Sequence, residues 1–482
     1  MKRYIIFSLF SLVVLSFGIT GCKKALDENP KTFIPPNKFF TNPESYELAV
    51  VGVYSRLPLY SGNTAMLLEM CTDIYGQPSS AFEQALPMYQ NAPTAFYYNT
   101  RESWSGAYSI IKNANFIIEE LPKGPLADDK KNQLMAEARF LRAYAYFHLV
   151  QLYGDVPMPV KPAADYTSLQ MPRTPQAEVY KLILDDLNFA ETNLPDVAPM
   201  QGRVYKIVST ALLAKVYLTM AGHPLKQTQF YVNARDKALA VINSPKFHLV
   251  SDFAEVFHKT TYTTESIWEK LYDPALGGNP VHSITLTAAT YNPLLVPADW
   301  FINSFPKGDR RKEWGIVENY PGPGNTKLNT FFYKFADASG VASGVNSSGA
   351  IVGYTLPYLR LAEMYLIAAE AENEAVGPAN AYQYINEIRK RARVNKADAT
   401  NVPDLTGLTP GQFREAVLME RKWELSLEGS SWFDLKRTNS FQRIQTLRGT
   451  GLVNPIGLYN QTWLIPDTEV ENNDIPQNPL YK

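Results

Sequence analysis

Two long stretches of the chain, residues 59–100 and 247–354, combine aromatic side chains with amide and carboxylate groups, and the second also contains guanidinium groups. A sugar ring presents one face of C–H groups and a rim of hydroxyls. Binding it therefore requires a flat aromatic group and several hydrogen-bond partners. The aromatic residues in the two stretches that we select as stacking candidates are Tyr75, Tyr97, Tyr98, Tyr291, Trp314 and Tyr320. We expect an amphipathic ligand such as a glycan there, although each ring taken alone could equally belong to the core.

Polar side chains in the same stretches could bind the hydroxyl rim, among them Asp73, Gln77, Asn91, Asn292 and Asn319. Three tryptophans are assigned to packing instead. Trp104 lies on a helical apolar stripe, Trp268 lies in a predicted strand, and Trp300 fits the start of a packed helix.

Catalytic chemistry has little support in the sequence. Hydrolysis of a glycosidic bond needs two carboxylates across that bond, but Asp185-Asp186 and Glu119-Glu120 lie on predicted helices, where they are expected to face solvent. No Gly-x-Ser-x-Gly nucleophile motif and no His-Glu-x-x-His metal motif occurs. His148 falls within a packed helical stretch. We therefore predict no enzyme, no catalytic residue, no metal and no cofactor.

Cys22 ends a short apolar leader with the sequence Ile19-Thr20-Gly21-Cys22, after a basic start at Lys2 and Arg3. The apolar run is shorter than the ~20 residues of a membrane span and has the layout of a secretory signal. A Cys directly after two small residues is similar to a bacterial lipobox, with Ile19 where Leu is usual. Residues 1–21 are thus predicted to be a signal peptide and Cys22 a lipidated residue that ties the protein to a membrane.

Composition agrees with an exported globular protein. The net charge of −1 gives no general attraction to nucleic acid, so no nucleic-acid partner is expected. The chain has two cysteines, and if Cys22 is lipidated then Cys71 has no intrachain disulfide partner. The fold must therefore be held by packing.

Apolar residues recur at helical spacing in four successive pairs of segments. The first pair begins at Asn42-Pro43, a cap residue followed by Pro at the first helical position, and continues with the stripe that contains Trp104. The other pairs are 134–149 with 179–190, 208–216 with 234–241, and 361–371 with 381–392. This pattern predicts a mainly α protein of helical hairpins with long irregular, partly β inserts. The four pairs resemble tetratricopeptide-like helix pairs, but their irregular spacing does not by itself establish that repeat.

Two further helix starts can be recognised. Thr174-Pro175 is expected to cap the helix at 179–190, and Thr409 with Gln412 fits a capping box that opens a helix running to about Leu427. We divide the chain after the leader into an N-terminal half, 22–245, with three helix pairs, and a C-terminal half, 246–482. The second half holds the ligand-loop insert, the fourth pair and a closing segment.

Short motifs follow one another in a recognisable order along nearly the whole mature chain. They include Leu26-Asp27-Glu28-Asn29-Pro30, the segment 138–147, Tyr153-Gly154-Asp155-Val156-Pro157, the segments 359–371 and 386–392, Glu420-Arg421, Glu424-Leu425-Ser426-Leu427-Glu428-Gly429, Trp432-Phe433-Asp434-Leu435-Lys436-Arg437 and Gln477-Asn478-Pro479-Leu480-Tyr481. In these motifs the chain resembles the RagB/SusD family of Bacteroidetes outer-membrane lipoproteins. Ser431 is a departure, since the family often has a basic residue there.

The resemblance implies a SusD-like superhelix of helix pairs that supports an irregular ligand-binding half, without catalytic activity. It implies a lipid-anchored outer-membrane protein, facing the cell exterior, that captures a nutrient, most often a glycan. The partner would be a SusC-like TonB-dependent transporter, over which the lipoprotein sits as a lid. A peptide cargo, or a lid that binds nothing, remains as an alternative.

Charged residues within these motifs are interpreted as scaffold. Arg421, Glu424 and Glu428 lie at helical spacing on one face, and Asp434 with Arg437 could extend the set. Carboxylate–guanidinium pairs of this kind fix geometry.

Overall fold

The computed structural model describes residues 39–57, 64, 68–76, 93–168, 170–273, 279, 281, 295–318, 330–335, 353–448 and 461–478. The predicted signal peptide, Cys22, Tyr291 and Tyr320 lie outside these residues, as does the expected strand at 284–286. No helix within the described ranges is both long and apolar enough to cross a membrane.

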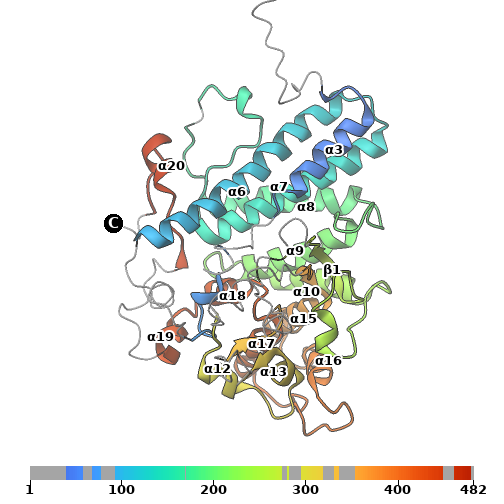
Figure 1. Cartoon of the computed structure of the whole chain (residues 1–482), viewed down its shortest axis with the longest axis vertical. Coiled ribbons are helices and arrows are strands. Elements are labelled where there is room, and N and C mark those ends of the chain that lie inside the picture. Colours follow the sequence, from blue (N-terminus) through green and yellow to red (C-terminus); the bar gives the residue numbers. More distant parts are fainter. Residues whose placement is uncertain are drawn as a thin grey trace, which may run out of the picture.

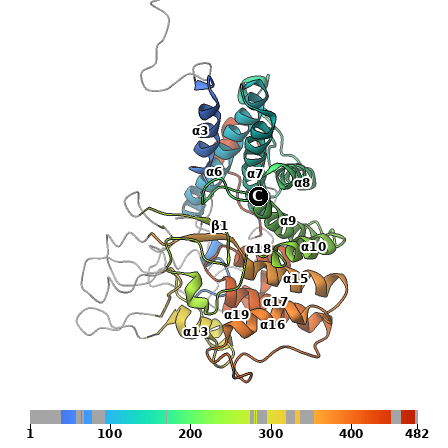
Figure 2. The same ribbon diagram turned by 90° about the vertical axis from the view of Figure 1, so that its right-hand side faces the viewer.

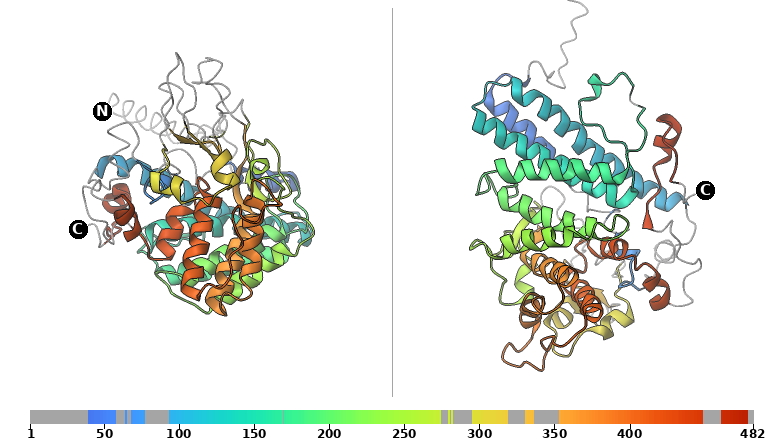
Figure 3. Two further views of the ribbon diagram at one scale, coloured as in Figure 1. Left: turned by 90° about the horizontal axis from the view of Figure 1, so that it is seen from below. Right: turned by 180° about the vertical axis from the view of Figure 1, so that it is seen from behind.

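Helices stack pair upon pair along the molecule (Figure 1), as the apolar stripes predict. The eight helices of the predicted pairs are α3 (Pro43–Tyr54) with α6 (Pro93–Glu120), α7 (Asp128–Tyr153) with α8 (Gln176–Asn193), α9 (Lys206–Ala221) with α10 (Phe230–Ile242), and α15 (Leu361–Ala375) with α16 (Tyr382–Ala392). Each pair packs on the next, so that α6 contacts α7, α8 contacts α9 and α10 contacts α15. Figure 3 shows these successive layers from blue to orange. The expectation of a mainly helical, superhelical stack is confirmed.

The remaining helices of the described residues are α12 (Asp299–Ser304), α13 (Arg310–Gly315), α17 (Pro410–Leu425), α18 (Ser431–Arg437), α19 (Gln442–Arg448) and α20 (Asp467–Asn472), with short 3-10 turns η2 (Leu121–Lys123), η3 (Ala163–Asp165) and η4 (Phe253–Val256). Of these helices, α12, α13, α17, α18 and α19 lie around the second half of the stack, whereas α20 lies beside α6 (Figure 1). Figure 2 shows α13 and β1 on one flank of the stack, opposite α10.

Local signals set several helix ends. Asn42 caps α3 by accepting a hydrogen bond from the Ser45 amide at 3.0 Å. Thr409 and Gln412 form the expected reciprocal capping box at α17. That helix ends at Leu425, two residues before the expected end.

Two helix starts differ from expectation. The helix α6 begins at Pro93, so residues 93–100 are helical although they were assigned to an irregular insert. The N-cap of α8 is Pro175, which has no side-chain cap, and Thr174 pairs with Val156 in a β-bridge. The amide of Gln176 instead donates to Asp155 Oδ1 at 2.8 Å. A long-range carboxylate thus caps this helix in place of its local Thr.

Two short antiparallel sheets cover part of the stack. The strand β1 (Ser266–Lys270) pairs with β4 (Leu356–Arg360), with Ser266 opposite Arg360 and Glu269 opposite Pro357. The strand β2 (Ile316–Val317) pairs with β3 (Phe331–Phe332). The strand at Trp268 was predicted. Its partner β4, which runs directly into α15, was missed.

Candidate ligand-binding site

The two predicted ligand stretches meet at residues 68–76 and 295–302. The amide of Gly76 donates to the Val296 carbonyl at 2.7 Å, and the Ala298 amide donates to the Ile74 carbonyl at 2.9 Å. These backbone bonds bring together segments more than 200 residues apart in sequence. The described parts of the two stretches therefore lie next to each other.

Tyr75 lies at this junction but belongs to the core. Its side chain is 1% exposed, its hydroxyl donates to Glu69 Oε2 at 2.6 Å, and its ring centroid is 5.1 Å from that of Phe332. A ring enclosed in this way has no free face for a ligand. The stacking role expected for Tyr75 is wrong in this structure, because the second stretch packs over the ring.

Asp73, a polar candidate of the same segment, is also structural. Its carboxylate is fully buried and pairs with Lys422 Nζ at 2.6 Å. Its carbonyl accepts a hydrogen bond from the Trp300 indole at 2.7 Å. This contact confirms that Trp300 packs at the start of α12.

Two of the stacking candidates have described side chains. Tyr75 is buried, whereas Trp314 is half-buried. Trp314 lies on α13, with its ring nearly parallel to Phe257 at a 20° interplanar angle. His258 and Tyr333 approach the same indole, with centroids 5.2 Å and 5.4 Å away. We call Trp314, His258, Tyr333 and Tyr354 the Trp314 cluster.

All four rings of the Trp314 cluster are half-buried. His258 stacks on Tyr354 with centroids 4.6 Å apart and an interplanar angle of 6°. The residues on either side of this cluster in sequence, 319–329 and 336–352, lie outside the described part of the chain. Partly exposed aromatic rings fixed by their neighbours can cover the apolar face of a ligand.

Tyr97 and Tyr98 fall within α6, a helix that is described at these two residues by its backbone alone. The two rings therefore remain predictions, like Tyr291 and Tyr320. The structural assignments of Trp104 and Trp268 are confirmed. Trp104 is 4% exposed, and the indole of the buried Trp268 donates to the Gly202 carbonyl at 3.0 Å.

His148 and Asp186 are two titratable residues of the helices that have structural roles. His148 is buried between α6 and α7, with Nε2 2.8 Å from Ser103 Oγ, and burial lowers its pKa to about 3. Asp186 was expected to face solvent, but it is 1% exposed and accepts two hydrogen bonds from Arg142 at 2.7 and 2.8 Å. Only its neighbour Asp185 is exposed.

Among the described residues no group of three His, Cys, Asp or Glu side chains is arranged to hold a metal ion. The carboxyls of Glu424 and Asp434, whose pKa values are lowered most, lie in buried ion pairs. The largest set of such pairs lies beneath the second stretch.

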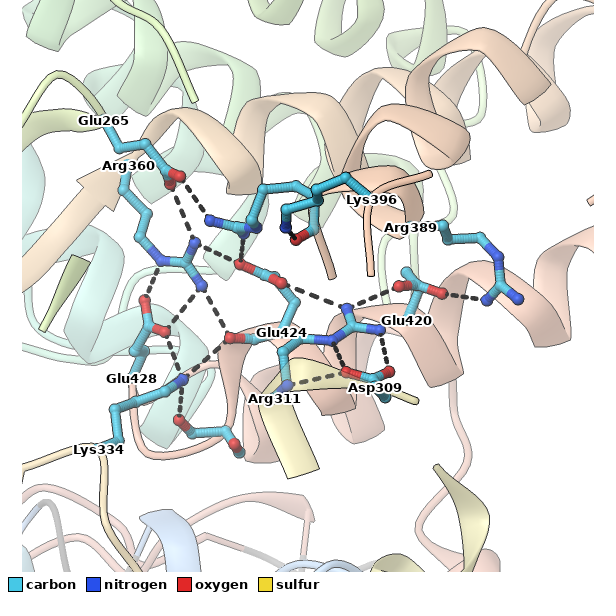
Figure 4. Close-up of polar contacts among 12 residues, drawn as sticks. Glu265, Asp309, Arg311, Lys334, Arg360, Arg389, Lys396, Glu420, Glu424 and Glu428 are labelled. Carbon is cyan, nitrogen blue, oxygen red and sulfur yellow. Dashed lines mark hydrogen bonds and ion pairs between the residues drawn. The ribbon is translucent and has the colours of Figure 1, made fainter. Parts of the chain in front are cut away.

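This set is one connected ion-pair network of ten residues with buried side chains, of which all but Arg391 are labelled in Figure 4. Its basic members are Arg311, Lys334, Arg360, Arg389 and Arg391, and its acidic members are Glu265, Asp309, Glu420, Glu424 and Glu428. Five positive side chains balance five negative ones. A neutral network avoids leaving an uncompensated charge in the core.

Glu424 on α17 is the centre of the network. Its Oε1 accepts from Arg360 Nη1 at 2.6 Å and from Arg391, and its Oε2 lies 3.3 Å from Arg311 Nη1. Burial opposes ionisation of Glu424, but the three guanidinium groups outweigh it and hold the pKa of this carboxyl well below its usual range. The side chain is therefore a fixed anion.

Lys334, directly after β3, anchors the far end of the second stretch. Its ammonium donates to the carbonyls of Glu424 and Ser426 at 2.9 and 2.7 Å and to Glu428 at 2.8 Å. Arg311 makes the equivalent connection from α13, three residues before Trp314, through Glu420 at 2.6 Å. The Trp314 cluster is thus held on both sides by charges that end on α17 or just after it.

Comparison with known proteins agrees with this architecture. Residues 260–480 match the family model described as "SusD family", and residues 26–218 match one described as "Starch-binding associating with outer membrane". The chain belongs to the SusD/RagB family. Members of the SusD family are binding proteins without catalytic activity, so the expectation that this chain is not an enzyme is confirmed.

Similar proteins cover most of the chain. A SusD-like protein of Formosa agariphila is 28% identical over 88% of each chain, and the starch-binding protein SusD of Bacteroides thetaiotaomicron is 25% identical over 77% of each. The crystal structure of a SusD superfamily protein from Parabacteroides distasonis has a TM-score of 0.79, with 25% identity, and covers 91% of this chain and 99% of that one. A laminarin binding SusD-like protein has a TM-score of 0.75 at 24% identity and covers 91% and 100%.

The SusD-family motifs of this chain supply six of the ten network charges, namely Arg360, Arg389, Arg391, Glu420, Glu424 and Glu428, in agreement with the scaffold interpretation. One detail differs: Arg421, Glu424 and Glu428 do not pair along one helix face. Glu428 lies beyond the end of α17, and Arg421 turns to a separate set in which Asp434 bridges Arg421 and Arg437, each at 2.8 Å. The predicted extension through Asp434 and Arg437 is confirmed, but it belongs to that second set.

Proposed function

We propose that this protein is a cell-surface lipoprotein, anchored through Cys22, that binds an oligosaccharide or polysaccharide and delivers it to a SusC-type TonB-dependent transporter. The observation that carries the proposal is the match of the N-terminal half to a starch-binding, outer-membrane-associated family. Starch and laminarin are the ligands named for two of its relatives. Both are glucans, and we extend only the class, a glycan, to this chain.

The Trp314 cluster supports a ligand with an apolar face. Its rings are half-buried, so a ligand could cover further apolar surface at a small ordering cost, because the rings are already fixed by their contacts. Burying one aromatic face contributes ~1.5–3 kcal/mol. Tyr97, Tyr98, Tyr291 and Tyr320 would add faces around it if they reach the same ligand.

A glycan panel tests the binding step. The purified protein is titrated by calorimetry with soluble oligosaccharides of several linkages, and the best ligand is then measured with Trp314→Ala. We expect affinity to fall about ten- to hundredfold. Tyr384→Ala is the matched control, since Tyr384 is half-buried on α16 away from the cluster, and it should leave affinity unchanged.

The outcomes separate the alternatives. Unchanged affinity for Trp314→Ala, with a lowered melting temperature, would make Trp314 a core residue. Binding to a peptide library and to no glycan would favour a peptide cargo. Binding to neither, with a transporter that still co-purifies, would favour a lid without cargo.

The anchor and the partner need separate tests. Cys22→Ala should abolish incorporation of labelled palmitate and release the protein from the membrane fraction. Affinity purification of the native lipoprotein from outer membranes should recover a large β-barrel transporter. Absence of any such partner would count against delivery and leave binding intact.

A further inference from the structure

A cavity of about 590 Å³ lies between α6, the segment 157–171 and the C-terminal α20. Figure 1 shows α20 beside α6, close to the loop that follows α7. This volume is within the range of small-molecule sites. The cavity shares no lining residue with the Trp314 cluster, so a ligand bound here would be independent of the proposed glycan site.

Polar groups in two of the cavity walls are already bonded to each other. The Tyr108 hydroxyl donates to the Pro157 carbonyl at 2.6 Å, and the Asn115 amide donates to the Pro159 carbonyl at 2.9 Å. The Tyr166 hydroxyl accepts from the amides of Val160 and Lys161 at 2.8 and 3.0 Å. Because these groups are satisfied within the protein, an occupant gains little by bringing polar groups into the interior.

Apolar side chains make up much of the remaining lining, among them Trp104, Ile111, Met171 and Ile475, with the hydroxyls of Ser105 and Ser109 on the α6 wall. An apolar body would fit there without leaving a buried donor or acceptor unpaired. A saccharide would not, since its hydroxyl rim would find few open partners.

Two lysines lie at the solvent side of the lining. Lys112 on α6 and Lys161 in the loop are both exposed, and within the described ranges neither ammonium has an ion-pair partner. The third wall carries Glu469, whose carboxylate accepts a hydrogen bond from Asn473. A negative group on the occupant would therefore lie towards α6 and the loop, away from α20.

We propose that this cavity binds an amphipathic carboxylate, with its apolar body among the side chains of α6 and the segment 157–171 and its carboxylate between Lys112 and Lys161. The site is separate from the glycan site and would let one chain hold a second, chemically different ligand.

Head-group charge gives the sharpest test. The purified protein is titrated by calorimetry with laurate, and separately with dodecyltrimethylammonium, both below their micelle concentrations. The two probes share a twelve-carbon tail and differ in the sign of the head. We expect one laurate per chain and binding about tenfold weaker for the cationic probe, because two exposed ion pairs contribute at this scale. The preference should shrink as salt is added.

Variants then locate the site. Lys112→Gln with Lys161→Gln should lower laurate affinity about tenfold and remove the preference for the anionic head. The matched control, Lys259→Gln with Lys307→Gln, removes two exposed lysines elsewhere and should change neither. Trp314→Ala should retain laurate binding.

Ser109→Trp adds a ring from the α6 wall and should block laurate, with circular dichroism used to check the fold. If that variant does not fold, the lysine pair decides the matter alone. Equal binding of both probes, non-saturable binding, or laurate affinity unchanged in the lysine double variant would overturn the proposal.

Discussion

Replacing Glu424 by Gln is the most direct test of the ion-pair network. The change keeps the size of the side chain and removes one negative charge. Arg311, Arg360 and Arg391 then face an amide, and the network carries a net positive charge in a region where Glu424 is fully buried. The new amide N–H₂ also points donors at groups that are themselves donors.

The magnitude follows from the burial of the pairs. Breaking a buried ion pair by removing one partner costs about 3–5 kcal/mol of unfolding free energy. A chain of this length has an unfolding entropy near ~1 kcal/mol per kelvin. The melting temperature should therefore fall by about 3–5 °C. Urea unfolding followed by circular dichroism measures the free energy directly.

Glu387→Gln is the matched control. Glu387 makes an exposed pair with Lys390 at 2.9 Å on α16, and such pairs contribute at most about 0.5 kcal/mol. Adding Arg391→Gln to Glu424→Gln restores neutrality, so the double variant should lose less than the sum of the two single losses. A loss below about 1 kcal/mol for Glu424→Gln, or strict additivity in the double variant, would refute the account of a coupled network.

The loss of stability at acid pH should also depend on Glu424. The arginines lower the pKa of Glu424 below the ordinary 4.5 in spite of its burial. A depressed pKa means that the stabilisation is complete above about pH 4.5 and is lost as the pH falls further. Glu424→Gln should flatten this part of the stability profile.

Three further changes give distinct outcomes. Burial raises the pKa of Glu269 to about 7, so its contribution to stability is lost as the pH rises from 4.5 through 7. Glu269→Gln should raise the unfolding free energy by about 3 kcal/mol at pH 8 and leave it nearly unchanged at pH 4, and an equal gain at both values would contradict this. Asp155→Ala removes the acceptor of the Gln176 amide and should cost about 1 kcal/mol in urea unfolding, whereas no loss would make that bond irrelevant to α8. Gly222→Ala would place a Cβ 2.5 Å from the Arg437 carbonyl oxygen and should lower stability by about 1–3 kcal/mol, and a neutral result would mean that the backbone there can move apart.

The features predicted correctly from the sequence depend on residues close to one another in the chain. The stripe through Trp104, the cap at Asn42 and the capping box at Thr409 each depend on residues within one or two turns, and all three are present in the structure. The family motifs predicted the helical stack and the scaffold role of the charges.

Long-range pairing was not predictable from the same patterns. Periodicity says which face of α8 is apolar, but it does not show that Asp186 meets Arg142, 44 residues away. Tyr75 was misassigned for a related reason. Its neighbours have the composition of a binding loop, and its burial depends on the second stretch packing over it.

The network gives a physical reason why a binding protein would place so many charges in its core. The helices and strands of the second stretch are short among its described residues, so helix or sheet hydrogen bonds alone do not fix its position. Arg311 and Lys334 instead attach it to α17 at two points on either side of Trp314. Ion pairs are directional, since a bidentate or bridging guanidinium accepts few geometries. These ion pairs add only modest net stability, but they would fix the position of the rings of the Trp314 cluster. Glu424→Gln should therefore weaken ligand binding as well as the fold, whereas Gly222→Ala, which also destabilises the fold but lies outside the network, should leave affinity unchanged.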